Sequence, residues 1–165
     1  AAEAMAYTRT DCPRAAAHAL TEHVPVAVVT LGAEGAYGVD RRTGETAEVP
    51  AIAVKALDPT GAGDVFVAGF VTGSLAGWPL ADRLAFAGLT AALSVQEFGG
   101  SLSAPGWSEV AAWWREVRSL DGQDPAALSR YAFLAALVPD GGPCHAARPW
   151  PLRRAVPTIG FRAPQ

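Results

Sequence analysis

The chain has 165 residues, half of them apolar, and a formal net charge of −3 at pH 7. This length allows one or two domains with a substantial core, and the small negative charge argues against binding to nucleic acid or to an anionic membrane surface. Cys12 and Cys144 lie far apart without metal-ligand spacing, which favours a reduced, cytoplasmic protein.

The start of the sequence, Ala1-Ala2-Glu3, lacks both a Met and a signal-peptide pattern. No apolar run reaches the roughly 18 residues that a membrane-spanning helix needs. We therefore expect no membrane partner, and we expect the sequence to begin inside a larger protein.

The first 50 residues predict two helices, a strand and a hairpin. Residues 2–7 are typical of the end of a helix, and Asp11-Cys12-Pro13 supplies a cap and an N-terminal proline for a second helix over 14–23. The β-branched run 26–31 is typical of a strand buried on both faces. Two strands, 36–40 and 45–49, flank the turn Arg41-Arg42-Thr43-Gly44.

The next 70 residues predict one more strand, at 52–57, followed by three helices. The first helix, 65–76, is apolar nearly all round, so we expect it to be buried. The second, 80–98, ends at Gly99-Gly100, and Ser108 caps the third, 109–118. Helices and strands in this order indicate an α/β layered fold over residues 1–118.

Residues 119–165 differ in composition, being rich in Pro, Gly and Arg. Only 126–138 has a helical pattern, which predicts a single helix there. The rest lacks any period, and we expect it to form a largely irregular tail.

A loop with two carboxylates, Asp58-Pro59-Thr60-Gly61-Ala62-Gly63-Asp64, joins the strand 52–57 to the first long helix. Its small residues leave the backbone N–H groups of 61–64 bare at the positive end of a helix dipole, which favours an anion such as a phosphate. Asp64 places a carboxylate beside that anion, and the pair suggests phosphoryl transfer to a hydroxyl. Taken alone, Asp64 is more typical of a helix N-cap than of a catalytic base.

The same loop, continued by Phe66 and Gly69-Phe70, resembles the C-terminal signature of the ribokinase-like (PfkB) family of carbohydrate and nucleoside kinases. Thr30-Leu31-Gly32-Ala33-Glu34-Gly35 resembles the family's nucleotide-binding strand end. The resemblance covers about residues 1–118 and implies the C-terminal portion of a three-layer α/β/α fold. Family members are considerably longer than this chain, so the resemblance implies that the chain is the C-terminal half of such a kinase.

The resemblance implies that the full enzyme moves the γ-phosphate of ATP to a hydroxyl of a sugar, with Mg²⁺. Asp64 is then the catalytic base that contacts the substrate hydroxyl, and Gly61, Ala62 and Gly63 form the anion hole. The isolated chain lacks most of the sugar pocket, so we expect it to be inactive. A nucleoside kinase, and a non-catalytic remnant that binds nucleotide or a partner, stay open as alternatives. The full-length protein is a candidate homodimer.

The resemblance also implies binding residues. Those for ATP are Thr30, Gly32, Gly35, Gly63 and Gly88. Gly88 departs from the family pattern, because many members carry a side chain such as Asn there, near the adenine. Residues implied for a monovalent cation, usually K⁺, are Asp58, Thr60, Ser94, Glu97, Gly99 and Ser103. Glu3 matches the last position of an Asn-x-x-Glu element that organises magnesium, although a solvated glutamate explains it equally well.

Overall fold

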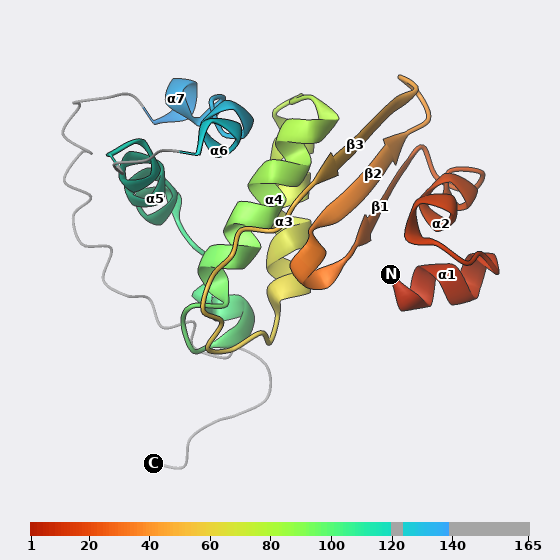
Figure 1. The fold of residues 1–165 in the computed structure, drawn as a ribbon, viewed down its shortest axis with the longest axis horizontal. Coiled ribbons are helices and arrows are strands. Elements are labelled where there is room, and N and C mark those ends of the chain that lie inside the picture. The colour runs from red at the N-terminus through yellow and green to blue at the C-terminus, as the bar shows by residue number, and fades with distance from the viewer. Residues whose placement is uncertain (120–123, 139–165) are drawn as a thin grey trace, which may run out of the picture.

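The structure is a computed structural model that describes residues 1–119 and 124–138. Its elements form three layers, with α1 and α2 on one side of a sheet and α3 and α4 on the other (Figure 1). In chain order they are α1 (Ala2–Thr8), α2 (Pro13–Leu20), β1 (Val26–Thr30), the 3₁₀ helix η1 (Gly32–Glu34), β2 (Ala36–Asp40), β3 (Glu45–Val49), α3 (Ala62–Leu75), α4 (Leu80–Ser94), the 3₁₀ helix η2 (Gly100–Ser103), α5 (Trp107–Ser119), α6 (Pro125–Arg130) and α7 (Leu134–Leu137). None of the described helices is long and apolar enough to cross a membrane.

The three strands form an antiparallel sheet in the order β1-β2-β3. Val26 pairs with Asp40, and Asp40 pairs with Glu45, so the predicted hairpin is confirmed. Every residue of the central strand β2 is buried. The prediction that β1 is buried on both faces holds in part: Ala27 and Val29 are buried, Val26 and Val28 are partly buried and pack against the core on the other face, and only the end of the strand, Thr30, is exposed.

Apolar side chains pack against both faces of the sheet. On one face the core contains Leu80, Leu84 and Ala87 of α4, which are fully buried. On the other face Ala17 of α2 packs with Val29 of β1 and with further strand residues. A sheet covered by helices on both faces confirms the expected α/β/α layering.

Helices α2 and α5 differ from their predicted bounds and caps. Helix α2 ends at Leu20, and its N-cap is Cys12 of the predicted capping segment, whose Sγ accepts a hydrogen bond from the N–H of Ala15 at 3.4 Å. Helix α5 begins before Ser108, and the carboxylate of Glu109 accepts the N–H of Gly106 at 3.0 Å. A carboxylate that reaches back to the helix start therefore does the capping that was assigned to the serine.

Helix α4 ends at Ser94 and does not continue to Phe98. The carbonyl of Val95 accepts the N–H groups of Leu57 and Asp58 at 2.7 and 3.1 Å. The same carbonyl would accept the N–H of Gly99 in a continued helix, and that N–H instead donates to the Asp58 carboxylate at 3.4 Å. A tertiary contact therefore ends the helix before the Gly-Gly pair.

The strand predicted at 52–57 is absent, because these residues pair with none of the described strands. The segment instead runs beside α4 and leads into the loop at the start of α3 (Figure 1). Strand formation needs a neighbouring ladder of hydrogen bonds, and after Pro50 the chain leaves the edge of β3.

Helix α3 is only partly buried, contrary to the prediction. Val65, Phe66, Gly69 and Gly73 lie on its buried side. A stripe of three apolar residues lies on the other side of the helix. Val67 is 59% exposed, Val71 is 47% exposed and Leu75 is 84% exposed. Within the described residues, nothing covers this stripe.

Residues 124–138 form two short helices, α6 and α7, where one was predicted. The chain turns at Tyr131, and both Tyr131 and Leu134 are buried in the main core. The remainder of the predicted tail, 139–165, lies outside the described residues, and the domain boundary at 118 stays a prediction.

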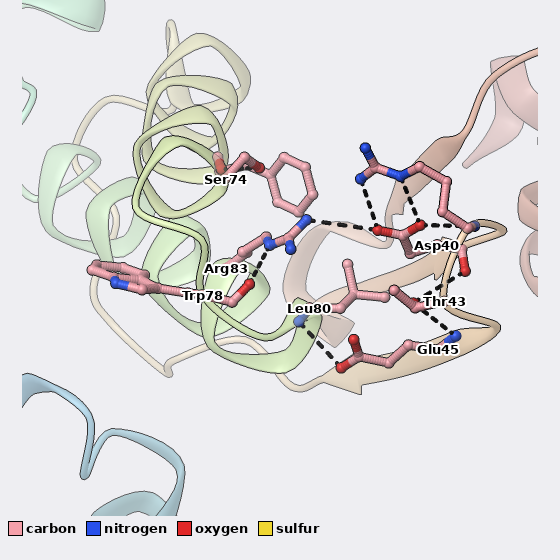
Figure 2. Close-up of polar contacts among 9 residues, drawn as sticks. Asp40, Thr43, Glu45, Ser74, Trp78, Leu80 and Arg83 are labelled. Atoms are coloured by element: carbon pink, nitrogen blue, oxygen red, sulfur yellow. Dashed lines mark hydrogen bonds and ion pairs between the residues drawn. The ribbon is translucent and has the colours of Figure 1, made fainter.

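A buried carboxylate fastens the hairpin to the corner between α3 and α4 (Figure 2). Asp40 is 2% exposed and pairs with Arg42 at 3.0 Å and with Arg83 at 3.8 Å. Hydrogen bonding from Arg42 holds the pKa of Asp40 below its ordinary value. Beside it, Glu45 accepts the N–H of Leu80 at 3.1 Å at the start of α4. These contacts fix α4, which forms one wall of the site described next.

Candidate active site

The start of α3 carries backbone donors and a carboxylate side by side. Gly61 is the N-cap and Asp64 is the third residue of the helix, so Asp64 is not the N-cap. The N–H of Ala62 donates to the carbonyl of Pro59 at 3.2 Å, whereas those of Gly63 and Asp64 meet no acceptor among the described residues. Two free donors at the positive end of a helix dipole form a site for an anion.

Gly61 is required at its position for two reasons. Its φ is +76°, a region that side chains rarely adopt. A Cβ atom there would also lie 2.5 Å from the N and 2.6 Å from the Oγ of Ser101. The loop before α3 and the helix η2 therefore touch through the backbone of a glycine.

Ser101, on η2, contacts the carboxylate at the centre of the site. Its Oγ donates to Oδ2 of Asp64 at 3.3 Å, while Asp64 itself is exposed. A carboxylate with one oxygen held by a hydroxyl keeps the other oxygen free to face a ligand. Sequence reasoning missed Ser101, because a contact between residues so far apart in the chain leaves no local pattern.

Asp58 holds the loop from its other end. Its Oδ1 accepts the N–H of Thr60 at 3.0 Å, and its Oδ2 accepts the N–H of Gly99 at 3.4 Å. Hydrogen bonding from the hydroxyl and the N–H of Thr60, with a smaller contribution from Gly99, holds the pKa of Asp58 below its ordinary value. The carboxylate thus joins the loop before α3 to the turn after α4.

Most of the residues expected at a monovalent cation lie in these two joined segments. Three of them, Asp58, Thr60 and Gly99, are in contact through the Asp58 carboxylate. In addition, the hydroxyl of Ser103 donates to the carbonyls of Ser94 and Gly100 at 2.9 and 2.6 Å. The side chain of Glu97 is exposed, and only its N–H joins the turn, through Ser94. The described residues contain no group of three or more His, Cys, Asp or Glu side chains that could hold a metal. Backbone carbonyls with one carboxylate suit a hard cation of low charge.

A pocket of about 740 Å³ opens beside the first turn of α3. All five residues expected to bind ATP line it: Thr30, Gly32, Gly35, Gly63 and Gly88. They come from the end of β1, the turn around η1, the start of α3 and the middle of α4. The fold therefore collects into one cavity residues that are spread over almost 60 positions.

The turn around η1 is tight at the mouth of this pocket. The N–H of Leu31 donates to the carbonyl of Gly35 at 2.8 Å, which closes the turn. A Cβ on Gly35 would lie 2.0 Å from the carbonyl oxygen of Val49, so no side chain fits. By contrast, a Cβ on Gly63 or Gly88 would meet nothing within 4 Å, and both positions open into free space.

Glu3 is exposed on the first turn of α1, and no described partner contacts it. The backbone nitrogen of Ala1 donates to the carbonyl of Thr30 at 3.0 Å, which sets the start of α1 beside one rim of the pocket. This placement is compatible with a magnesium role and with a solvated glutamate alike.

Comparison with known proteins agrees with this geometry. The profile of the pfkB family carbohydrate kinases matches residues 2–107. A ribokinase of Schizosaccharomyces pombe is 43% identical over 83 residues, which is 50% of this chain and 26% of that protein. A nucleoside kinase of Methanocaldococcus jannaschii is 35% identical over 92 residues, 54% of this chain and 29% of that protein.

Among solved structures, a ribokinase of Arabidopsis thaliana complexed with ribose and ATP superposes with a TM-score of 0.59 at 27% identity. The superposition covers 67% of this chain and 38% of the Arabidopsis chain. The chain thus spans well under half the length of the relatives that it matches.

Proposed function

Because the chain belongs to the pfkB family of carbohydrate kinases, we propose that it forms the nucleotide-binding and catalytic part of a sugar kinase that uses ATP. One observation carries this proposal. The free N–H groups of Gly63 and Asp64, the Asp64 carboxylate and a pocket of about 740 Å³ meet at the start of α3. Such a volume suits a nucleotide, and the donors suit its phosphates.

The proposed reaction is an in-line transfer. The substrate hydroxyl oxygen bonds to the γ-phosphorus of ATP, the bond from that phosphorus to the bridging oxygen breaks, and ADP leaves. The hydroxyl proton passes to the free oxygen of Asp64. A carboxylate at a helix N-terminus is stabilised as the anion, so it orients the hydroxyl first and takes the proton late. The N–H groups of Gly63 and Asp64 stabilise the charge on the transferred group.

Two ions complete the proposal. Mg²⁺ bound with ATP would neutralise phosphate charge, and Glu3 is the residue near the pocket rim that we assign to its surroundings. A monovalent cation, K⁺ in our proposal, would take carbonyl oxygens of the turn after α4 and steady the anion hole through the Asp58 contacts. This second assignment rests on the joined segments and the oxygen-rich donor set described above.

The chain forms only part of a sugar kinase, and we propose that it has no kinase activity alone. The exposed apolar stripe Val67, Val71 and Leu75 on α3 is a surface that the rest of a longer kinase would cover. Its relatives also extend far beyond the matched region. Turnover of any sugar by the purified 165-residue chain at about 1–100 per second, the range of kinases, would show that the site is complete.

Sugar and nucleoside remain the two candidate acceptors, the second because of the nucleoside kinase relative. The test is a phosphorylation screen of the full-length protein with ribose, fructose, ketodeoxygluconate and adenosine. Transfer to a sugar supports the proposal, and transfer to adenosine alone moves the protein to the nucleoside class. Transfer to none of them, with ATP bound, supports a non-catalytic remnant.

A further inference from the structure

The walls of the ATP pocket are almost wholly apolar. Twenty-one described residues line it, and Thr30 is the only one among them with a polar side chain. The others are Gly, Ala, Val, Leu, Ile, Pro and Phe. Among the described residues that line the pocket, Thr30 is therefore the one whose side chain can donate to or accept from a bound base.

One wall also lacks free backbone groups. It consists of α4, from Leu84 to Ala92, and ends at Val95. The N–H and C=O groups inside a helix are used by its own hydrogen bonds. The carbonyl of Val95 is used as well, because it accepts from Leu57 and Asp58. This wall offers a base only apolar contact.

The opposite wall is formed by the segment 50–56, of which all residues except Lys55 line the pocket. Its backbone forms no hydrogen bond to any described residue, and it belongs to none of the described strands. Each residue from Ala51 to Ala56 carries one donor and one acceptor. Such a segment can meet the donor–acceptor edge of adenine or the acceptor–donor edge of guanine by a small shift of the base.

We propose that this pocket binds purine nucleoside triphosphates as a class and does not select adenine over guanine. The base lies between the apolar face of α4 and the free backbone of 50–56. This inference rests on the proposed ATP site. A pocket that selects by fixed polar side chains rejects the wrong ligand by about 10⁴-fold or more, whereas apolar walls discriminate far less. We expect the dissociation constants of ATP and GTP to differ by less than about tenfold.

A substitution at Gly88 tests whether the lack of polar side chains explains why the pocket does not select adenine over guanine. It lies in the middle of α4, at a φ that is not positive, and a Cβ there meets nothing within 4 Å. Gly88→Asn adds one donor and one acceptor, a pair that matches the N6 and N7 atoms of adenine. Gly88→Ala is the matched control, because it adds a methyl group without a polar atom.

The experiment is calorimetric titration of the full 165-residue chain and both variants with MgATP, MgGTP and inorganic tripolyphosphate. We expect the ratio of the ATP and GTP dissociation constants to stay within about tenfold in the wild type and in Gly88→Ala, whatever the affinity of that variant, and Gly88→Asn to favour ATP by about tenfold or more. Tripolyphosphate should bind at least about tenfold more weakly than either nucleotide, since it cannot use the apolar walls. Circular dichroism checks that each variant is folded.

Three results would overturn the inference. ATP binding more than about tenfold tighter than GTP in the wild type would mean that the site distinguishes the two bases. Tripolyphosphate as tight as ATP would mean that the base does not occupy the pocket. If no nucleotide binds, both the proposed ATP site and this inference are wrong. The first of these results would reject the inference alone, since ATP still binds, and would leave the proposed function intact.

Discussion

Two neighbouring glycines in the loop before α3 should respond in opposite ways to the same substitution. Gly61→Ala puts a methyl group at φ +76° and within 2.6 Å of Ser101. Gly63→Ala puts one on the first turn of α3, where φ is not positive and no atom lies within 4 Å. The first variant tests the fold of the loop, and the second tests the anion site in front of it.

The magnitudes follow from the geometry. A left-handed alanine costs about 1–2 kcal/mol before the contact with Ser101 is relieved, so Gly61→Ala should lower the free energy of unfolding by about 2 kcal/mol or more. Gly63→Ala should leave it unchanged or raise it by up to about 1 kcal/mol, since Gly is the poorer helix former. For a chain of this size the first change lowers the Tm by roughly 4–8 °C.

Binding separates the two positions further. The methyl group of Gly63→Ala is added next to the free N–H groups, in space that no described atom fills, and we expect it to crowd a bound phosphate, so ATP affinity should fall by about tenfold or more while the protein stays stable. Thermal unfolding and ATP titration of both variants measure these quantities. Unchanged ATP affinity in Gly63→Ala would refute the anion site, and a wild-type Tm in Gly61→Ala would refute the argument for the loop.

Three further predictions concern contacts around the site. Ser101→Ala in the full-length protein should lower kcat by about tenfold and leave ATP affinity unchanged, with Ser101→Thr restoring the rate; a wild-type kcat would show that the hydroxyl does not position Asp64. The pKa of Asp58 is lowered in the folded state, so its stabilising effect is complete above the unfolded value near 4 and is lost as the pH falls through the folded pKa. The protection factor of the Gly99 amide against hydrogen exchange, taken relative to its intrinsic rate at each pH, should therefore fall below about pH 4 in the wild type but not in Asp58→Ala, and an equal response in both would remove Asp58 as the cause. Asp40→Asn should lower the free energy of unfolding by about 2–3 kcal/mol, because it leaves the largely buried Arg83 without its carboxylate. The matched control Glu48→Gln, in an exposed pair with Arg14, should cost less than about 1 kcal/mol, and equal losses would contradict the importance of burial.

The elements of the fold that the sequence predicts correctly are those that form through interactions between residues close together in the chain. The hairpin 36–49 follows from its turn and strand propensities, and helix α3 follows from the glycine loop and an apolar run. The end of α4 could not be read from the sequence, because it is set by the contact of Val95 with Leu57 and Asp58. Likewise, the run 52–57 has the residues of a strand but no partner among the described strands.

In the candidate site, too, some features can be predicted from the sequence and others cannot. The family signature predicts roles for Asp58, Asp64 and the glycines, and the structure brings the five residues expected to bind ATP into one pocket. The partner of Asp64 and the scarcity of polar side chains in the pocket emerge only when distant segments come together. The burial of α3 was overestimated, because an apolar helix predicts burial only when a covering element is present.

The central claim is that Asp64 accepts the proton of the hydroxyl that attacks ATP. Its most direct test is transfer of the labelled γ-phosphate of ATP to the accepted sugar by the full-length protein, with wild type and Asp64→Asn compared at saturating ATP. The account predicts a fall in kcat of about 10²–10⁴-fold in the variant, with an unchanged dissociation constant for ATP. An unchanged kcat in Asp64→Asn would contradict the assignment of this residue and the mechanism built on it.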